Sequence, residues 1–228
     1  MYRGEGMADA CFVHIIELCL EIDRIAADIY TMLNRGEADS RLKPYWADMA
    51  REENEHVLFW ERLLAEVRDN EVPDIFDDPQ AMRETLVQLK EDVDALRSTP
   101  VSPSDPAVSF MLAYKLEFYL LHPAFAALFR LMRRHTGDSS PEDKYEEHID
   151  RLIQALKAIG ADTPVFSLFA DIIHRVWVTN NELAKKIGEI KTLQNLIPMC
   201  TNCKKVINCK GYWETMTYYL RKHPDSSF

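Results

Sequence analysis

The stretch WADMAREENEHVLFW, residues 46–60, decides the fold of this chain. Placed at 100° per residue, its apolar side chains fall on one face of a helix. With its continuation, that stripe consists of Trp46, Met49, Ala50, Val57, Trp60, Leu64 and Val67. Glu53 and His56 lie inside the stripe, whereas Glu52 and Glu55 lie on or beyond its edge. Burying a carboxylate costs several kcal/mol unless it is paired or binds a metal ion. The pattern therefore predicts a helix that presents Glu53 and His56 to the interior.

A helix predicted over about 7–34 repeats this arrangement with one acidic residue. Its apolar stripe is Phe12, Ile15, Ile16, Cys19, Ile22, Ala26, Ile29 and Tyr30. Asp23 falls inside the stripe, and Glu17 and Glu21 point to the other side. Asp23 therefore needs a partner in the interior.

Two later helices, predicted over about 105–135 and 141–159, each carry further polar residues on an apolar face. Glu117 lies in a row formed by Phe110, Ala113, Tyr114, Leu121, Ala124 and Leu128. His122 precedes Pro123, and we interpret it as a residue at a kink or in a hydrogen bond rather than as a metal ligand. His148 lies inside the last stripe with Tyr145 three residues before it. The residues that face away there are Glu146, Glu147 and Asp150.

Breakers and periodicity place the remaining helices at about 41–69, 79–98 and 164–195. The 79–98 helix is predicted to cross between two pairs of bundle helices, as in bundles with a long connection. We therefore predict an all-α fold in three parts: a four-helix bundle over 7–160, a long helix over 164–197 and a cysteine-containing tail over 198–228.

Composition limits the function classes. The 228 residues include 7 glycines and are 47% hydrophobic, which favours long helices over many short strands. A net charge of −10 disfavours nucleic acids and anionic membranes as partners, because both require a basic face, and favours cations. No stretch approaches 18 apolar residues and no secretory signal pattern opens the chain, so we expect a cytoplasmic location.

The inward residues resemble the ligand pattern of the ferritin-like superfamily, and most closely its rubrerythrin branch. Residues 21–30 are similar to the first-helix pattern of an acidic ligand with a tyrosine seven residues on, 50–56 resemble the second helix, and 145–149 resemble the fourth. The resemblance covers about 8–159 and implies one or two iron ions, or manganese or zinc in their place. The ligands it implies are Asp23, Glu53, His56, Glu117, Tyr145 and His148. It also implies non-haem iron oxidoreductase chemistry with dioxygen, peroxide or ferrous iron.

This chain departs from the family pattern at two positions. Asp23 is one methylene shorter than the usual glutamate, and Tyr145 stands where the fourth helix has a glutamate. The site could hold one metal ion, hold two unequally, use tyrosinate as a ligand or have lost its metal. The metal-free alternative is a buried polar network in which Asp23 and Glu117 are hydrogen-bonded to the two histidines and Tyr145. Metal binding is the interpretation we favour.

The helix predicted over 164–195 carries a heptad pattern. One position is wholly apolar, and it contains Phe169, Val176, Leu183, Ile190 and Ile197. The other contains Ile172, Thr179, Lys186 and Leu193, two of which are polar. The alternative is a single helix that packs back on the bundle, and we favour a projecting or dimerising helix. Together with the apolar 105–135 helix, this surface predicts a homodimer.

The tail resembles a short C-terminal module of bacterial signalling proteins, in which Ile-Pro, Cys-x-x-Cys-Lys-Lys and Gly-Tyr-Trp recur in this order. Cys200 and Cys203 supply half of a tetrahedral zinc site, and the second pair of that module would lie beyond Phe228. Cys209 or His223 would complete the site irregularly, so we expect reduced thiols without zinc. The tail also raises an alternative function, a non-enzymatic module that senses a metal, oxygen or redox change.

Overall fold

The computed structural model describes residues 5–69, 76, 78–100, 106–136, 141–159, 164–194, 205–207 and 213–215. The chain divides into two compact units, Met1–Asn181 and Glu182–Phe228. All regular secondary structure among the described residues of the first unit is helical, which confirms the all-α prediction for this part of the chain. No helix among the described residues has the length and apolar character needed to span a lipid bilayer.

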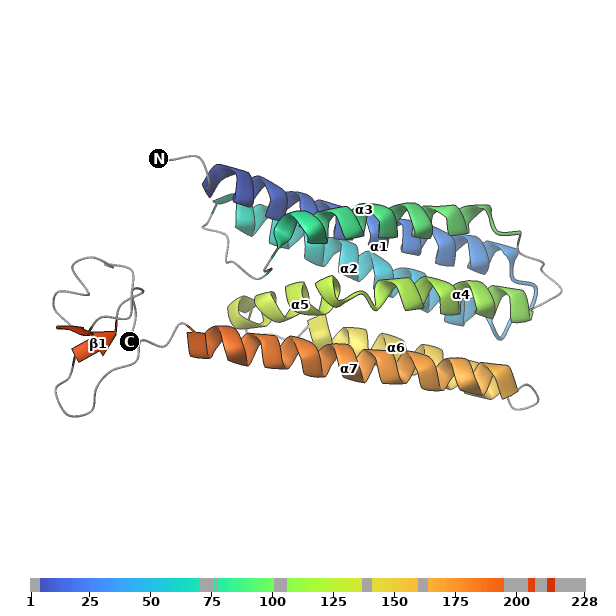
Figure 1. Cartoon of the computed structure of the whole chain (residues 1–228). Helices are drawn as coiled ribbons and strands as arrows, with labels where there is room; N and C mark the ends of the chain where they lie inside the picture. Colours follow the sequence, from blue (N-terminus) through green and yellow to red (C-terminus); the bar gives the residue numbers. More distant parts are fainter. Residues whose placement is uncertain are drawn as a thin grey trace. The chain divides into compact units, whose positions relative to one another are not determined.

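The helices begin and end close to the predicted positions (Figure 1). They are α1 (Glu5–Gly36), α2 (Lys43–Asp69), α3 (Pro79–Ala95), the short 3₁₀ helix η1 (Leu96–Ser98), α4 (Pro106–Leu120), α5 (Pro123–Thr136), α6 (Pro141–Ile159) and α7 (Pro164–Gln194). Asp78 caps α3 by accepting a hydrogen bond from the Ala81 amide at 2.9 Å, and Pro79 occupies the first turn, where no amide donor is needed.

The predicted 105–135 helix is wrong in one respect, because it is broken between α4 and α5 at Leu121 and His122. Pro123 has no amide hydrogen and disfavours helical backbone at the residue before it. The His122 ring then caps α5, accepting a hydrogen bond from the Ala124 amide at 3.3 Å through Nδ1. Burial lowers the pKa of His122, which keeps the ring neutral and able to accept. His122 thus has the local hydrogen-bonding role expected of it.

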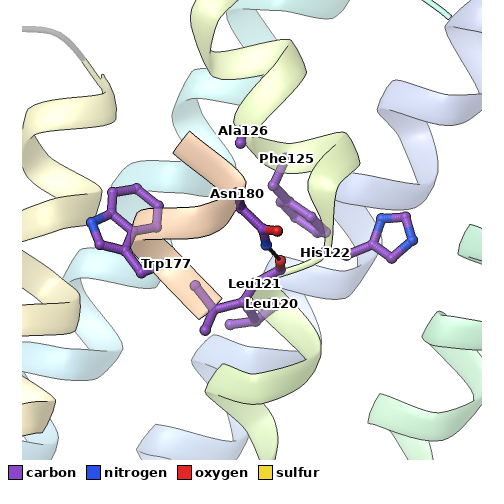
Figure 2. A pocket seen from close by; sticks show the side chains of 7 residues that line it. All are labelled: Leu120, Leu121, His122, Phe125, Ala126, Trp177 and Asn180. Carbon is purple, nitrogen blue, oxygen red and sulfur yellow. Dashed lines mark hydrogen bonds between the residues drawn. The ribbon is translucent and has the colours of Figure 1, made fainter. Parts of the chain in front are cut away.

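The break is stabilised from a distant part of the sequence. Asn180 of α7 donates a hydrogen bond to the Leu121 carbonyl oxygen, as Figure 2 shows. His122 and Asn180 also line a small pocket beside the break, together with Leu120, Leu121, Phe125, Ala126 and Trp177. A carbonyl that the broken helix leaves without an intrahelical donor is therefore paired by α7.

The core follows the predicted stripes. Every apolar residue assigned to the α1 stripe is buried, and so are those assigned to the α2 stripe. α3 packs on α1 through Leu86, Leu89 and Val93. Large aromatic side chains fill the space between the helices: Tyr30, Trp46, Trp60, Phe110, Phe125 and Phe129. Aliphatic and aromatic residues at helical spacing thus hold the helices in register around the polar residues described below.

The described part of the second unit includes a two-stranded antiparallel sheet that was not predicted. β1 (Lys205–Ile207) pairs with β2 (Trp213–Thr215), with Lys205 opposite Thr215 and Ile207 opposite Trp213. Strands of three residues are too short to show an alternating pattern in sequence. Cys200, Cys203, Cys209 and His223 lie outside the described residues, so the expectation about zinc stays a prediction.

Candidate metal centre

Asp23 reaches the interior from the middle of α1. Ile22 and Ala26 lie beside it in the buried stripe, and the side chain is almost wholly inaccessible to solvent. The indole of Trp60, on α2, donates a hydrogen bond from Nε1 to Asp23 Oδ2 at 2.5 Å. One oxygen of this carboxylate is therefore held by a neutral donor, as the sequence required of a buried aspartate.

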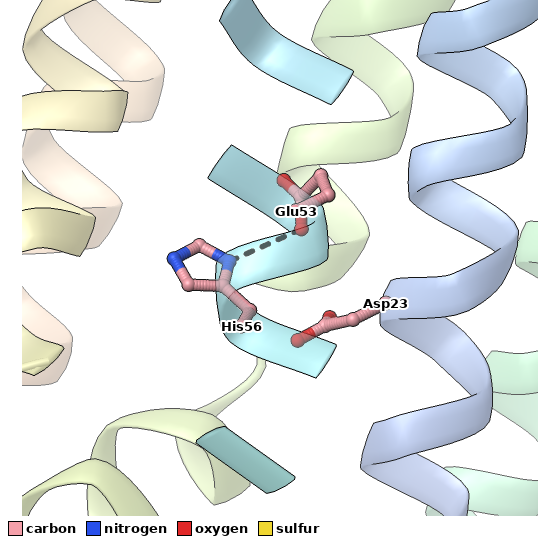
Figure 3. Close-up of side chains that lie close together, drawn as sticks. All are labelled: Asp23, Glu53 and His56. Carbon is pink, nitrogen blue, oxygen red and sulfur yellow. Dashed lines mark hydrogen bonds and ion pairs between the residues drawn. The ribbon is translucent and has the colours of Figure 1, made fainter. Parts of the chain in front are cut away.

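α2 contributes Glu53 and His56, which are one helical turn apart on the buried face. His56 Nδ1 lies 3.1 Å from Glu53 Oε2. Figure 3 shows these two side chains and Asp23 of α1 turned toward a common space. One ligand atom from each of the three residues lies within 4.8 Å of the others. We call Asp23, Glu53 and His56 the Asp23 group.

α4 and α6 bring in Glu117 and His148, both fully buried. His148 Nε2 lies 2.8 Å from Glu117 Oε1 and 3.3 Å from Glu53 Oε1. Glu53, Glu117 and His148 form a second set of ligand atoms within 4.8 Å of one another, which we call the Glu117 group. Glu53 belongs to both groups, so the two sets form one continuous cluster of three carboxylates and two imidazoles.

A second neutral donor holds Glu117. The Tyr30 hydroxyl of α1 donates a short hydrogen bond to Glu117 Oε1. Burial and the Glu117 carboxylate raise the pKa of Tyr30 well above its usual value, so the phenol stays protonated. Asp23 and Glu117 thus each have one oxygen bonded to an aromatic donor, Trp60 on one side and Tyr30 on the other.

His148 is oriented by a carboxylate that the sequence did not point to. Its Nδ1 lies 2.9 Å from Glu52 Oε2, and because an ionised carboxylate only accepts hydrogen bonds, Nδ1 carries the proton. Arg151, one turn further along α6, lies 2.5 Å from the other oxygen of Glu52. With Nδ1–H committed to Glu52, the ring directs Nε2 at Glu117 and Glu53.

That orientation places a lone pair of neutral His148 against two carboxylates, which is unfavourable without a proton or a cation between them. Burial alone would lower the pKa of His148, but Glu117, Glu52 and Glu53 together raise it well above the usual value. The metal-free cluster therefore attracts a proton to Nε2. A metal ion at the same place would replace it.

The pKa of Asp23 is also raised well above its usual value. Burial is the largest cause, followed by repulsion from Glu53, while the hydrogen bond from Trp60 opposes the shift. Burial and Asp23 likewise raise the pKa of the Cys19 thiol, which stays protonated and adds no charge. Among the side chains that the structure describes, no lysine or arginine is buried, so none of these cations balances the carboxylates from within the core.

The donor set fits a divalent transition-metal ion. Glu53 Oε1 and Glu117 Oε2 are buried and have no hydrogen-bond partner, although buried carboxylate oxygens are normally paired. Both belong to the groups whose ligand atoms converge. A mixture of carboxylate oxygens and imidazole nitrogens suits iron, manganese or zinc. One divalent ion with one retained proton would neutralise three carboxylates.

Five of the six residues singled out as ligands in the sequence are brought together: Asp23, Glu53, His56, Glu117 and His148. Tyr145 belongs to α6, but its side chain lies outside the described residues, so its role as a ligand stays a prediction. Glu52 was placed at or beyond the edge of the α2 stripe, and its side chain is 14% exposed. A search for acidic partners of an inward histidine across neighbouring helices could have identified it.

Comparisons with known proteins do not place the chain in a family. No family model matches it, and no curated protein does. The resemblance to the rubrerythrin branch therefore stays a prediction, and function has to be inferred from the residues of the site.

Proposed function

We propose that this chain binds divalent transition-metal ions, iron foremost, in the cluster formed by the Asp23 and Glu117 groups. The proposed activity is oxidation of ferrous iron or reduction of peroxide or dioxygen. The helices that supply the ligands would then correspond to a ferritin-like four-helix bundle of α1, α2, α4 with α5, and α6, with α3 as the crossover.

The observation that carries this proposal is the position of Glu53. Its carboxylate belongs to both ligand groups, and its Oε1 is buried without a hydrogen bond. A carboxylate shared between two converging sets of ligands can contribute to two metal positions. The nearest described donor, His148 Nε2, lies 3.3 Å from this oxygen and is shared with Glu117, and a buried oxygen left without a hydrogen bond costs about 1–3 kcal/mol.

The surrounding residues would prepare the ligands. Trp60 and Tyr30 each hold one oxygen of Asp23 and Glu117, respectively, and the oxygen held by Tyr30, Glu117 Oε1, is also the one that lies next to His148 Nε2. Glu52 fixes the tautomer of His148 so that Nε2 is the ligating atom, as outer carboxylates do for metal-bound histidines. Phe129 packs near the His56 ring, with centroids 5.8 Å apart, and helps to exclude water.

Iron held by these residues would supply one-electron chemistry, and the reduction of hydrogen peroxide to two molecules of water would need two such electrons and two protons. The aromatic residues around the cluster leave the carboxylates and His148 as the groups able to accept or release those protons. We place the proton of the metal-free protein at His148 Nε2, between Glu117 and Glu53.

The direct test is metal analysis of protein purified without a nickel column, followed by anaerobic titration with ferrous iron or cobalt. We expect saturable binding of fewer than two tightly held ions per chain, because Tyr145 stands where a second bridging or terminal glutamate would be. Glu53→Ala should abolish binding at both positions because both groups use this residue. Asp23→Ala and Glu117→Ala should each weaken one position.

Glu55→Ala is the matched control. Glu55 lies on the same helix, half a turn from Glu53, but its side chain is 37% exposed and paired with Arg51 at 3.1 Å. This variant should bind metal like the wild type. The proposal is wrong if iron, manganese and zinc are all absent after reconstitution, and if Glu53→Leu with Glu117→Leu raises thermal stability without any loss of activity.

A second candidate function, metal or redox sensing without turnover, is favoured by one contact. Asn180 of α7 is hydrogen-bonded to the carbonyl of Leu121, and Leu121 donates its amide to the Glu117 carbonyl at 2.9 Å. The backbone of a candidate ligand is thus two hydrogen bonds from α7, the helix within which the boundary between the two units falls. Measured turnover of peroxide or ferrous iron distinguishes the enzyme from the sensor, because a sensor binds its metal ion without catalysing a reaction.

A further inference from the structure

Exposed apolar side chains gather on two helices of the first unit. Among the described residues, seven large apolar side chains are exposed, and all but Leu58 lie on α4 or α7. On α4 they are Met111 and Phe118, and at the start of α7 they are Val165 and Leu168. Val178 lies on the opposite side of α7, and Leu183 belongs to the second unit. The first four lie on two neighbouring helices, whereas scattered surface residues occur singly.

α7 has two apolar stripes, and the bundle covers one of them. Phe166, Ala170, Ile173 and Trp177 are buried against the other helices. At 100° per residue, a second stripe lies about 100° round the helix; it contains Val165, Phe169, Ile172 and Val176. The spacing of this second stripe is four, three and four residues, which is the heptad spacing identified in the sequence. The heptad positions are therefore only partly covered: Phe169 and Val176 pack against the edge of the core, and Val165 is exposed.

The second stripe is continuous with the outer face of α4. The rings of Tyr114 and Phe169 stack with centroids 4.3 Å apart, and Tyr114 also stacks on Phe118. Further along, Leu121 meets Asn180, so α4 and α7 run in the same direction. Met111 then lies at the level of Val165, one turn before the stacked pair. The α4–α7 strip consists of Met111, Tyr114, Phe118, Val165, Leu168, Phe169, Ile172 and Val176.

The composition of the strip is that of an interface centre. It is rich in aromatic residues, with one methionine, and has no charged member, which matches the enrichment seen where proteins associate. Lys115 lies on the same exposed face of α4, four residues after Met111 and three before Phe118. Its ammonium lies 5.9 Å over the Tyr119 ring, which places the charge on the side of α4 away from Tyr114.

We propose that the α4–α7 strip is the interface through which two copies of this chain form a two-fold symmetric dimer. A heptad-spaced stripe fits another helix with the same spacing, and the chain carries that stripe itself. Two-fold symmetry brings the strip of one copy onto the strip of the other. The two parallel helices of one copy would pack face to face against the same two helices of the other copy.

The area of the strip fits this assignment. From Val165 to Val176 the helix rises about 17 Å, and two adjacent helices are about 20 Å across, giving about 340 Å² per copy. A stable interface buries about 800 Å² per partner, of which the apolar centre is a part and a polar rim the remainder. Exposed polar residues beside the strip, Asp171 and Arg175 among them, supply such a rim.

The test is sedimentation velocity of the full chain at micromolar concentration. We compare Leu168→Glu with Leu58→Glu, because these leucines are 55% and 51% exposed and only the first lies on the strip. We compare Val165→Glu with Val178→Glu in the same way; these valines are 42% and 40% exposed, and Val178 is on the opposite side of α7. Circular dichroism and metal content of each variant establish that the fold is retained.

We expect the wild type and both control variants to sediment as dimers and both strip variants as monomers. Loss of one central contact typically raises the dissociation constant of an interface about 30-fold. Two-fold symmetry places each substitution in the interface twice, so the dissociation constant of the dimer should rise about 1,000-fold. A monomeric wild type would overturn the assignment. So would a dimer that persists in both strip variants, or control variants that dissociate to the same extent.

Discussion

Replacement of Glu52 tests whether the outer carboxylate organises the Glu117 group. Glu52→Gln keeps an oxygen that can accept the hydrogen bond from His148 Nδ1–H, now 2.9 Å from Oε2, but removes the charge. It also leaves Arg151 without its carboxylate partner. Glu52→Ala removes the acceptor as well, so the ring can rotate and either tautomer is available.

The size of the effect follows from these contacts. Loss of a carboxylate partner of a metal-bound histidine typically costs 10–100-fold in metal affinity, about 1.4–2.7 kcal/mol. Because glutamine retains the acceptor, we expect about 10-fold weaker binding at the Glu117 group for Glu52→Gln, and about 100-fold for Glu52→Ala. Binding at the Asp23 group, which does not use His148, should stay within about twofold.

An anaerobic titration with cobalt, monitored by visible absorption, should resolve the two metal positions as two binding steps. The step that is lost in Asp23→Ala belongs to the Asp23 group. Glu55→Gln is the control, because Glu55 carries the same charge on the same helix and points to solvent. Equal effects of Glu52→Gln and Glu55→Gln would refute the positioning role. Equal weakening of both metal positions by Glu52→Ala would refute it as well, since only one group contains His148.

Four further outcomes are expected. Tyr30→Phe should lower the free energy of unfolding of the metal-loaded protein by about 1.5–3 kcal/mol, measured in urea, because a buried hydrogen bond to a carboxylate is lost. Tyr45→Phe is the control and should be neutral or stabilising, because the buried Tyr45 hydroxyl has no hydrogen-bond partner. Asn180→Ala should speed amide hydrogen exchange around Leu121 without changing exchange in α1. Metal content should fall more in Glu53→Ala than in Tyr145→Phe, and Tyr145→Glu should raise it toward two ions. In the metal-free protein, the raised pKa values of Asp23 and His148 mean that the folded state binds more protons than the unfolded chain. Stability is therefore lost with rising pH from about 3.8 through Asp23 and from about 6.5 through His148, by up to about 1.4 kcal/mol per pH unit and group. The melting temperature should fall above about pH 6.5 because of His148, and a rise there would contradict this.

Helix positions and the inward residues could be predicted because burial repeats with the helical period. Asp23, Glu53 and Glu117 stood out as carboxylates within apolar stripes, and a long helix fixes which face each side chain occupies. Residues that face inward from neighbouring helices at a similar depth then meet. This reasoning needs only the period and does not depend on how the helices are connected.

Other features depend on contacts between helices and could not be read from one helix at a time. Glu52 lies at the edge of its stripe, and only the approach of α6 shows that it bonds to His148. The break before Pro123 depends on whether a distant group can pair the released carbonyl, and Asn180 does so from 59 residues away. The two apolar stripes of α7 have similar spacing, so the sequence alone could not show which of them the core buries.

The main alternative to a metal site, a buried polar network, can be weighed by counting donors. The three carboxylates of the cluster offer six oxygens. Among the side chains that the structure describes, the donors that face them are the indole of Trp60, the hydroxyl of Tyr30 and the ring nitrogens of His56 and His148, and His148 already gives Nδ1–H to Glu52. Two buried oxygens, Glu53 Oε1 and Glu117 Oε2, still have no hydrogen-bond partner. A metal-free network must hold extra protons to compensate, at His148 and at Asp23. A divalent ion bound between the carboxylates satisfies the same oxygens and supplies the missing charge, without requiring protons that the cluster would release as the pH rises.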